Sequence, residues 1–215
     1  MTQRLFDIAS SAMALIVFSL PLLVIIILIK MLDSGPVFYH QRRIGRGGNP
    51  FDLYKFRTMR KSSDSSLVTV TGDSRITPLG QILRRWKLDE LPQLWNVLRG
   101  DMRIIGPRPE AEKLVQYYTP SQRQLLDYKP GLAGLSQLVF PHEADLLRVS
   151  KNPENFYLKH LMPKKIAVDL EYERQRTFWS DIFLLIEVLF FVLSGKTSRK
   201  DNTLTAAVIH RTESI

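Results

Sequence analysis

The feature that most constrains this chain is an apolar run near its start. Residues Ile8 to Met31 read IASSAMALIVFSLPLLVIIILIKM, without a charged residue before Lys30. As a helix rising about 1.5 Å per residue, this run can cross a hydrocarbon core about 30 Å thick. A cleaved signal peptide fits less well, because its apolar part is usually about 7–15 residues and a small-residue cleavage site follows. Hydropathy alone therefore favours a simple transmembrane helix.

Two features of the run argue against a straight span. Pro21 lies near its middle and removes a helical hydrogen bond, and the hydroxyl of Ser19 can help to satisfy the freed backbone. Basic residues also flank the run on both sides: Arg4, Lys30, Arg42, Arg43 and Arg46. By the positive-inside tendency, both ends of the run would lie in the cytoplasm. We therefore expect residues 1–32 to form a re-entrant anchor helix, broken at Ser19 and Pro21, that enters and leaves by one membrane face.

Composition limits the remaining classes. The 215 residues suffice for one ordinary domain, and 30 Lys and Arg against 21 Asp and Glu give a formal charge of +9. Such a charge suits nucleic acid, an acidic membrane surface or a phosphorylated substrate. No cysteine is present, which excludes disulfides and thiolate metal sites. A nucleic-acid partner ranks last, because charge alone supports it and no binding module is recognisable.

The rest of the chain alternates between strand-like and helical patterns. Two aromatic and β-branched stretches around GRGGNP predict a β-hairpin, and the polar run 60–75 predicts a loop. Apolar spacing predicts helices over 78–97, 110–128 and 164–176. The apolar segment 181–195 is short for a membrane span, so we expect it to lie in the membrane interface, to pack on the anchor helix or to be a core helix. We expect a predominantly helical α/β fold in a monotopic membrane protein. Its small cytoplasmic catalytic domain, residues 33–195, would contain the hairpin, and residues 196–215 would form a disordered tail.

Two adjacent carboxylates precede a proline in the stretch KLDELPQ. Because proline is tolerated only in the first turn of a helix, Pro92 predicts a helix start at about Asp89 to Leu91, with Asp89 as N-cap. The positive end of a helix attracts phosphate, so Asp89 there could attack a phosphorus atom. The alternative is plain capping beside a solvated Glu90.

A set of basic residues surrounds this acidic pair along the sequence: Lys55, Arg57, Arg84, Arg85, Lys87, Arg103 and Arg108. Arginine binds phosphate through two nitrogens, and Arg108 lies between two prolines on what should be a stiff loop. Each residue alone is usually solvated surface, but together they suggest a diphosphate held against a metal ion. Mg²⁺ prefers carboxylate and phosphate oxygens, which suits Asp89 or Glu90. The four histidines show no ligand spacing.

The chain resembles the bacterial sugar transferases, the monotopic polyprenol-phosphate phosphoglycosyl transferases, in their small single-domain form. The matching blocks cover most of residues 4 to 185 and read, in order, RLFDIASSAMALIVFSLPLL, DSGPVFYHQRRIGRGGNPFDLYKFRTM, DSRITPLGQILRRWKLDELPQLWNVLRGDM, IIGPRP, KPGLAGLSQ and DLEYERQRTFWSDIFLL. The resemblance implies transfer of a phosphosugar from a nucleotide (UDP-type) diphosphate sugar to polyprenol phosphate, with release of the nucleoside monophosphate. It also implies the cytoplasmic face of the bacterial inner membrane, at the first membrane step of glycoconjugate assembly.

The resemblance also assigns roles to residues of the acidic pair and its basic neighbours. Asp89 would be the nucleophile that forms a covalent phosphosugar-aspartyl intermediate and would hold Mg²⁺, with Glu90 as its partner. Arg84 and Arg108 match phosphate-binding arginines. Lys55 and Arg57 match the KFRTM block and are candidates for the same task.

This chain departs from the family pattern at two places. Leu20 separates Ser19 from Pro21, and residues 138–154 replace a short Asn-Gly-Arg continuation, where sugar specificity could change. Asp169, Tyr172 and Asp181 match the last block but could equally be structural. A non-enzymatic basic membrane scaffold for polysaccharide assembly stays the alternative function, and a homodimer is left open.

Overall fold

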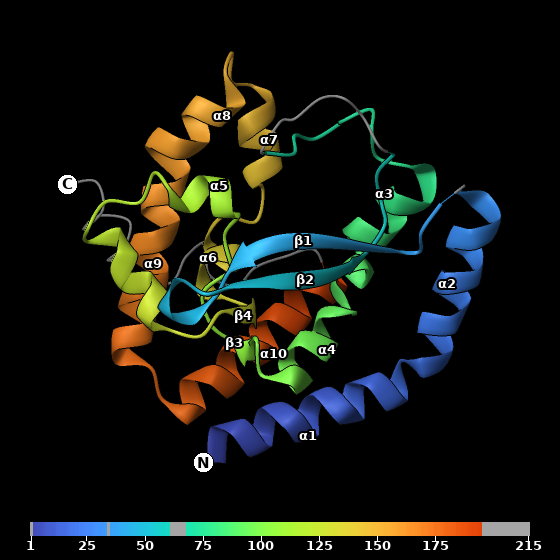
Figure 1. The fold of residues 1–215 in the computed structure, drawn as a ribbon, viewed down its shortest axis with the longest axis horizontal. Helices are drawn as coiled ribbons and strands as arrows, with labels where there is room; N and C mark the ends of the chain where they lie inside the picture. Colours follow the sequence, from blue (N-terminus) through green and yellow to red (C-terminus); the bar gives the residue numbers. More distant parts are fainter. Residues whose placement is uncertain (1, 34, 61–67, 195–215) are drawn as a thin grey trace.

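The computed structural model describes residues 2–33, 35–60 and 68–194. These residues form the predominantly helical α/β fold that the sequence predicts, with two small two-stranded sheets (Figure 1). Part of the predicted loop 60–75 and the predicted tail 196–215 lie outside the described residues. Residues 68–75 form bends and turns.

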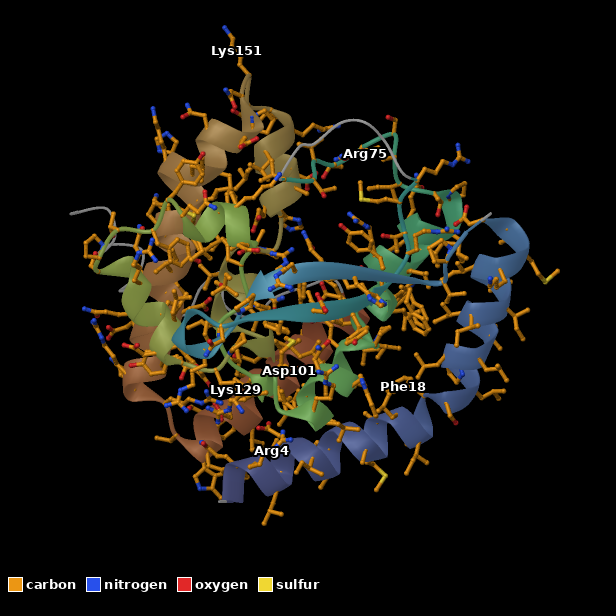
Figure 2. The ribbon with its side chains drawn as sticks, viewed as in Figure 1. Arg4, Phe18, Arg75, Asp101, Lys129 and Lys151 are labelled. Atoms are coloured by element: carbon orange, nitrogen blue, oxygen red, sulfur yellow. The ribbon has the colours of Figure 1, made fainter. Side chains whose placement is uncertain are left out.

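The chain starts with a bent pair of helices, α1 (Thr2–Val17) and α2 (Ser19–Leu32). They meet at Phe18, which lies at the corner between them in Figure 2, and their axes differ by 61°. The Ser19 hydroxyl donates to the carbonyl of Ile16 at 2.7 Å, inside this corner. Among the described helices none is long and apolar enough to cross a membrane alone, but the bent pair meets the same test together. The chain therefore bends where Ser19 and Pro21 predict a break.

Helix α1 is attached to the rest of the molecule through Arg4. Arg4 of α1 donates to the carbonyls of Val97 and Leu98, at 2.6 and 2.7 Å, near the end of α4 (Gln93–Arg99). Figure 2 places Arg4 near Lys129 and Asp101, at the edge of the molecule opposite Lys151.

Many apolar side chains of α1, α2 and α10 (Phe178–Ser194) remain exposed, including those of Ile16, Met31 and Phe183. Exposed apolar surface of this extent is typical of a binding or membrane surface.

Two sheets frame the centre of the molecule. The predicted hairpin is confirmed: β1 (Phe38–Ile44) pairs antiparallel with β2 (Pro50–Phe56), with Phe38 opposite Phe56. The second pair is parallel and was not predicted, and joins β3 (Arg103–Ile105) to β4 (Gly131–Ala133). A Cβ on Gly131 would lie 2.1 Å from the backbone nitrogen of Gly106, so only glycine permits this approach.

The hairpin contributes to each of the three apolar clusters of the described residues. Ile44 packs with α5 (Glu112–Val115) and α9 (Met162–Gln175), while Leu53 packs with α4, β3 and α10. Phe56 packs with α2 and α3 (Pro78–Arg85). Three short helices complete the described set: α6 (Leu135–Val139), α7 (Glu143–Arg148) and α8 (Pro153–Phe156). The hairpin thus packs on α2 as well as on helices of the rest of the chain.

Two of the predicted helices are interrupted. The stretch 78–97 breaks between α3 and α4, because Lys87 adopts a left-handed backbone with φ of 55°. The stretch 110–128 holds only α5 and a 3-10 helix, Gln122–Asp127, because Pro120 cannot continue a helix from α5. The helix predicted over 164–176 is confirmed as α9, and the apolar segment at 181–195 lies largely within α10.

Candidate active site

The acidic pair lies on a single 3-10 turn, Leu88–Glu90, that follows the left-handed Lys87. Helix α4 begins at Gln93 with Pro92 as its N-cap and without a side-chain capping bond, so the prediction of Asp89 as an N-cap is wrong. The solvated Glu90 of the alternative reading is also wrong, since Asp89 and Glu90 are only 5% and 7% exposed. The left-handed turn, rather than capping, directs these carboxylates into the protein.

Glu90 is held by two cations. Lys55 of β2 donates to Oε1 at 2.9 Å, and Arg108 donates to Oε1 at 2.6 Å and to Oε2 at 3.4 Å. Burial alone would raise the pKa of Glu90, but Arg108, Lys55 and Lys87 outweigh it and hold that pKa well below its usual value. In return, the charge of Glu90 raises the pKa of Arg108. Glu90 is therefore ionised and holds in place Lys55 and Arg108, two of the candidates for phosphate binding.

Asp89 has a different environment although it is the next residue. Within the described ranges, no hydrogen bond or ion pair reaches its carboxylate. Burial and the charge of Glu90 raise the pKa of Asp89, and the partly opposing charges belong to Lys55, Arg84 and Lys87. Neighbouring carboxylates whose pKa values are pushed apart are typical of catalytic sites. The Asp89 carboxylate is thus buried, unpaired and free to react, whereas the neighbouring Glu90 carboxylate is already paired with Lys55 and Arg108.

Arg84 approaches this site from the last turn of α3. Its Nε donates to the Thr58 hydroxyl at 2.9 Å, and an Nη lies 3.0 Å from the sulfur of Met59. These contacts hold the guanidinium close enough to Asp89 to act on its charge. The structure therefore brings Lys55, Arg84 and Arg108 to the acidic pair.

Arg57 and Arg103 contact the first two helices of the chain and the residue that follows them. An Nη of Arg57 donates to the carbonyl of Asp33 at 2.9 Å, just beyond the end of α2. Arg103 donates to Gln3 at 2.8 Å and faces Asp7 at 3.8 Å, both on α1. These two arginines link the α1–α2 pair to the rest of the chain. The phosphate-binding role of Arg57 stays a prediction.

Arg108 lies on a loop that is fixed at several points, in agreement with the stiffness expected from its flanking prolines. Gly106 N donates to the Ala133 carbonyl and Gly131 N to the Pro107 carbonyl, each at 2.9 Å. On the other side, an Nη of Arg43 donates to the Pro109 carbonyl at 3.1 Å. The parallel β3–β4 pair and the hairpin together position this loop.

The three residues of the last matching block have structural contacts. Asp169 accepts from the backbone nitrogen and hydroxyl of Ser136 at 2.9 and 2.8 Å, and burial raises its pKa to about 6. Asp181 accepts from the hydroxyl of Tyr172 at 2.9 Å and pairs with Arg176 at 2.8 Å. These contacts join α6 to α9 and α9 to α10.

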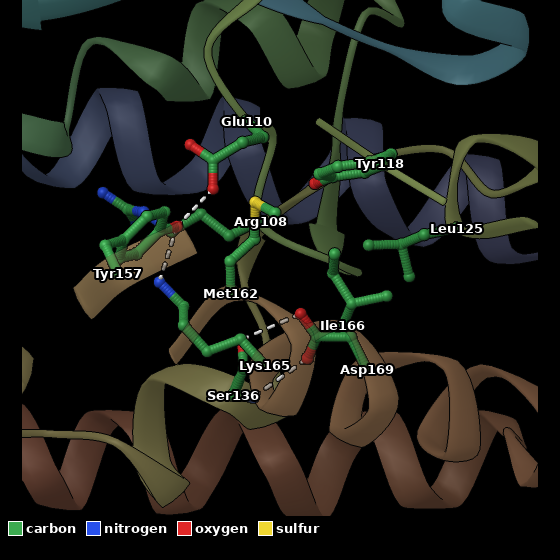
Figure 3. Close-up of a pocket in the computed structure, with 10 residues that line it drawn as sticks. All are labelled: Arg108, Glu110, Tyr118, Leu125, Ser136, Tyr157, Met162, Lys165, Ile166 and Asp169. Atoms are coloured by element: carbon green, nitrogen blue, oxygen red, sulfur yellow. Dashed lines mark hydrogen bonds between the residues drawn. The ribbon is translucent and has the colours of Figure 1, made fainter. Parts of the chain in front are cut away.

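Sequence reasoning missed a buried cluster behind Arg108. Glu110 accepts from Arg43 at 3.2 Å and from the hydroxyl of Tyr157, and Figure 3 shows both Glu110 and Tyr157 at the cavity that Arg108 lines. Tyr157 lies on a π-helix, Tyr157–Leu161. No local motif could have revealed the pairing, because 47 positions separate Tyr157 from Glu110.

A metal ion could be held at this site by Asp89 together with substrate phosphates. Across the residues that the structure describes, no group of three or more His, Cys, Asp or Glu side chains is arranged to hold a metal ion. Mg²⁺ is commonly bound by one or two carboxylates together with substrate phosphates. The unpaired carboxylate of Asp89 fits that arrangement, whereas Glu90 is already engaged.

Comparison with known proteins decides the family. The model of the family described as bacterial sugar transferase matches residues 1–195. The chain belongs to the bacterial sugar transferase family. That match extends from α1 through α10 and includes every residue of the candidate site.

Similar curated members of the family carry informative names. The UDP-glucose:undecaprenyl-phosphate glucose-1-phosphate transferase of Xanthomonas campestris pv. campestris is 40% identical, over 82% of this chain and 36% of the relative. The protein of that name in Caulobacter vibrioides is 35% identical, over 87% of this chain and 68% of the relative. The exopolysaccharide production protein ExoY of Rhizobium meliloti is 32% identical, over 88% and 84%. This bacterial sugar transferase thus spans about a third of its Xanthomonas relative.

Proposed function

We propose that this chain transfers a phosphosugar from a uridine diphosphate sugar to polyprenol phosphate and releases uridine monophosphate. The observation that carries the proposal is a buried, unpaired Asp89 beside a Glu90 that holds Arg108 and Lys55. The names of the relatives, which specify UDP-sugar donors and undecaprenyl phosphate, support the same reaction class. The reaction would be the first membrane step of glycoconjugate assembly.

The first half of the reaction would proceed at Asp89. Its carboxylate oxygen attacks the sugar-linked phosphorus, a new P–O bond forms, and the bond to uridine monophosphate breaks with the electron pair leaving on that product. Lys55, Arg84 and Arg108, which lie around the acidic pair, would face the negative charge that accumulates on the phosphoryl oxygens. Such preorganised cations stabilise a phosphoryl-transfer transition state.

Mg²⁺ would assist at Asp89, where it would neutralise the diphosphate and the leaving monophosphate. The raised pKa of Asp89 makes its ionised form costly without added positive charge. The chain's own cations lower that cost, and Glu90 keeps two of them in place. Glu90 would therefore position cations rather than attack phosphorus.

The second half would regenerate the enzyme. An oxygen of polyprenol phosphate attacks the phosphorus of the aspartyl adduct, the Asp89–phosphorus bond breaks, and the carboxylate is released. A phosphate monoester is largely ionised near neutral pH, so this attack needs little general-base help. Two displacements allow a soluble donor to leave before a lipid acceptor arrives.

The bent α1–α2 pair would carry the site to its lipid acceptor. We propose that the pair enters and leaves the bacterial inner membrane from the cytoplasmic face, with the exposed apolar side chains of α10 at the interface. The contact of Arg57 with Asp33, where α2 ends, supports a fixed relation between anchor and site.

The test is turnover by the purified full chain with uridine diphosphate sugars and polyprenol phosphate. Asp89→Asn should lower monophosphate release by at least about a thousand-fold. The matched control Asp127→Asn changes an exposed carboxylate and should behave as wild type. Chelation of Mg²⁺ should stop release, and mass spectrometry should find a phosphosugar on Asp89. Normal turnover by Asp89→Asn would refute the proposal and leave a membrane scaffold, whose liposome binding survives changes at Asp89 and Arg108.

A further inference from the structure

The loop that carries Arg108 has a second, buried attachment through Glu110. The Glu110 carboxylate accepts from Arg43 at 3.2 Å, from its neighbouring backbone nitrogen at Ala111 at 3.0 Å, and from the hydroxyl of Tyr157. The same Arg43 nitrogen donates to the carbonyl of Pro109, which directly follows Arg108. Glu110 therefore lies where the strand β1, the loop and the π-helix meet.

The Tyr157 hydroxyl is committed to this contact. Tyr157 is only 3% exposed, and burial together with Glu110 and Glu143 raises its pKa well above the usual value, so the hydroxyl stays protonated and donates. Lys165 lies 3.5 Å from the same hydroxyl and pairs with Glu143 of α7 at 2.6 Å. Tyr157 and Lys165 line a cavity of about 20 Å³ that Arg108 also lines (Figure 3).

Part of this cluster comes from the segment in which the chain departs from the family pattern. Glu143 lies within residues 138–154, and Tyr157 follows that segment by three positions. The cavity has room for about one water molecule and not for a sugar ring. Glu143 of this segment reaches the cluster through Lys165, which lies next to the Tyr157 hydroxyl.

We propose that Tyr157 is a positioning residue for Arg108, acting through Glu110 and the 106–111 loop, so that Arg108 faces the diphosphate of the donor. The inference rests on the proposed function for its substrate. The Glu110 side chain is only 15% exposed, so water cannot replace the Tyr157 hydroxyl as a hydrogen-bond donor. Without that hydroxyl, the Glu110 carboxylate shifts toward its remaining donors. The loop then loses one of its attachments and Arg108 its orientation.

The chain offers a matched pair of variants for the test. Tyr157→Phe removes only the hydroxyl that binds Glu110, whereas Tyr118→Phe removes a hydroxyl that lines the same cavity and makes no hydrogen bond within the part of the chain that the structure describes. Tyr157→Phe should raise the KM for the uridine diphosphate sugar about ten-fold, the lower end for a hydrogen bond to a charged group. The kcat/KM for the donor should fall by at least the same factor, because Arg108 also stabilises the transition state. The KM for polyprenol phosphate should change less than two-fold, and Tyr118→Phe should match wild type.

A double variant separates positioning from general stability. Glu110→Gln should also raise the donor KM, and adding Tyr157→Phe to it should change that KM little further, because both act on one contact. Independent, additive effects on the donor KM would overturn the inference. So would an unchanged donor KM in Tyr157→Phe while wild type turns over.

Hydrogen exchange of the full chain provides a readout that does not depend on turnover. The amides of Ile44 and Ala111 donate to the Glu110 backbone and side chain, so Tyr157→Phe should speed exchange in residues 106–111, and Tyr118→Phe should not. If wild type released no uridine monophosphate, the proposed function would fail on its own. Equal exchange in both variants would then still show that Tyr157 does not hold the loop.

Discussion

Replacing Glu90 by glutamine should destabilise the protein far more than removing the neighbouring charge. Glu90 contacts Arg108 at 2.6 Å and Lys55 at 2.9 Å, with side-chain exposures of 10% for Glu90, 29% for Arg108 and 15% for Lys55. Removing one partner of a buried ion pair costs about 3–5 kcal/mol, because the other charge is left unpaired. Glutamine keeps one acceptor oxygen, so we expect the free energy of unfolding to fall by about 2–4 kcal/mol.

Thermal unfolding of the detergent-solubilised chain at neutral pH measures this effect. In a chain of this size 1 kcal/mol corresponds to about 2–4 °C, so Glu90→Gln should melt roughly 5–15 °C below wild type. Asp89→Asn is the matched control, since it removes the adjacent carboxylate without breaking an ion pair. Because the folded-state pKa of Asp89 is raised, its charge costs stability as the pH rises through that pKa. Asp89→Asn should therefore melt at or slightly above the wild-type temperature.

The pH dependence of the Glu90 effect has the opposite sign. The folded-state pKa of Glu90 lies well below its ordinary value of 4.5, so its contribution is fully present above about pH 4.5 and is lost as the pH falls through the folded-state value. The difference between wild type and Glu90→Gln should stay constant from neutral pH down to that range and shrink below it. A Glu90→Gln protein that melts within about 1 °C of wild type at neutral pH would refute the reasoning.

Three further predictions concern the scaffold. Gly131→Ala places a Cβ 2.1 Å from Gly106 N and should prevent folding, seen as loss of soluble, cooperatively melting protein. Burial raises the pKa of Asp169 from 3.8 to about 6, so wild type should lose stability relative to Asp169→Asn as the pH rises from 4 to 7, by up to about 3 kcal/mol in unfolding experiments; a constant difference would contradict this. The chain has no cysteine, so Lys30→Cys can report topology: a re-entrant anchor leaves it open to thiol reagents on the cytoplasmic face, and Pro21→Ala should reduce that labelling by straightening the helix.

Local backbone chemistry made part of the fold readable from sequence. Pro21 predicted the bend next to Phe18, the glycine-rich turn predicted the β1–β2 hairpin, and regular apolar spacing predicted α9. Each of these signals acts within a few residues. The interrupted helices were mispredicted because apolar spacing continued across Lys87 and Pro120, where the backbone turns away.

The sequence by itself determined that Asp89 and Glu90 are adjacent, that basic residues are abundant nearby, and that the chain begins with an anchor-like apolar run. Only the tertiary structure decided that Glu90 takes both Lys55 and Arg108 while Asp89 stays unpaired. These partners lie 35 and 18 positions from Glu90. The physical reason is that composition states which charges exist, whereas pairing and desolvation depend on how distant segments pack and which groups they bury.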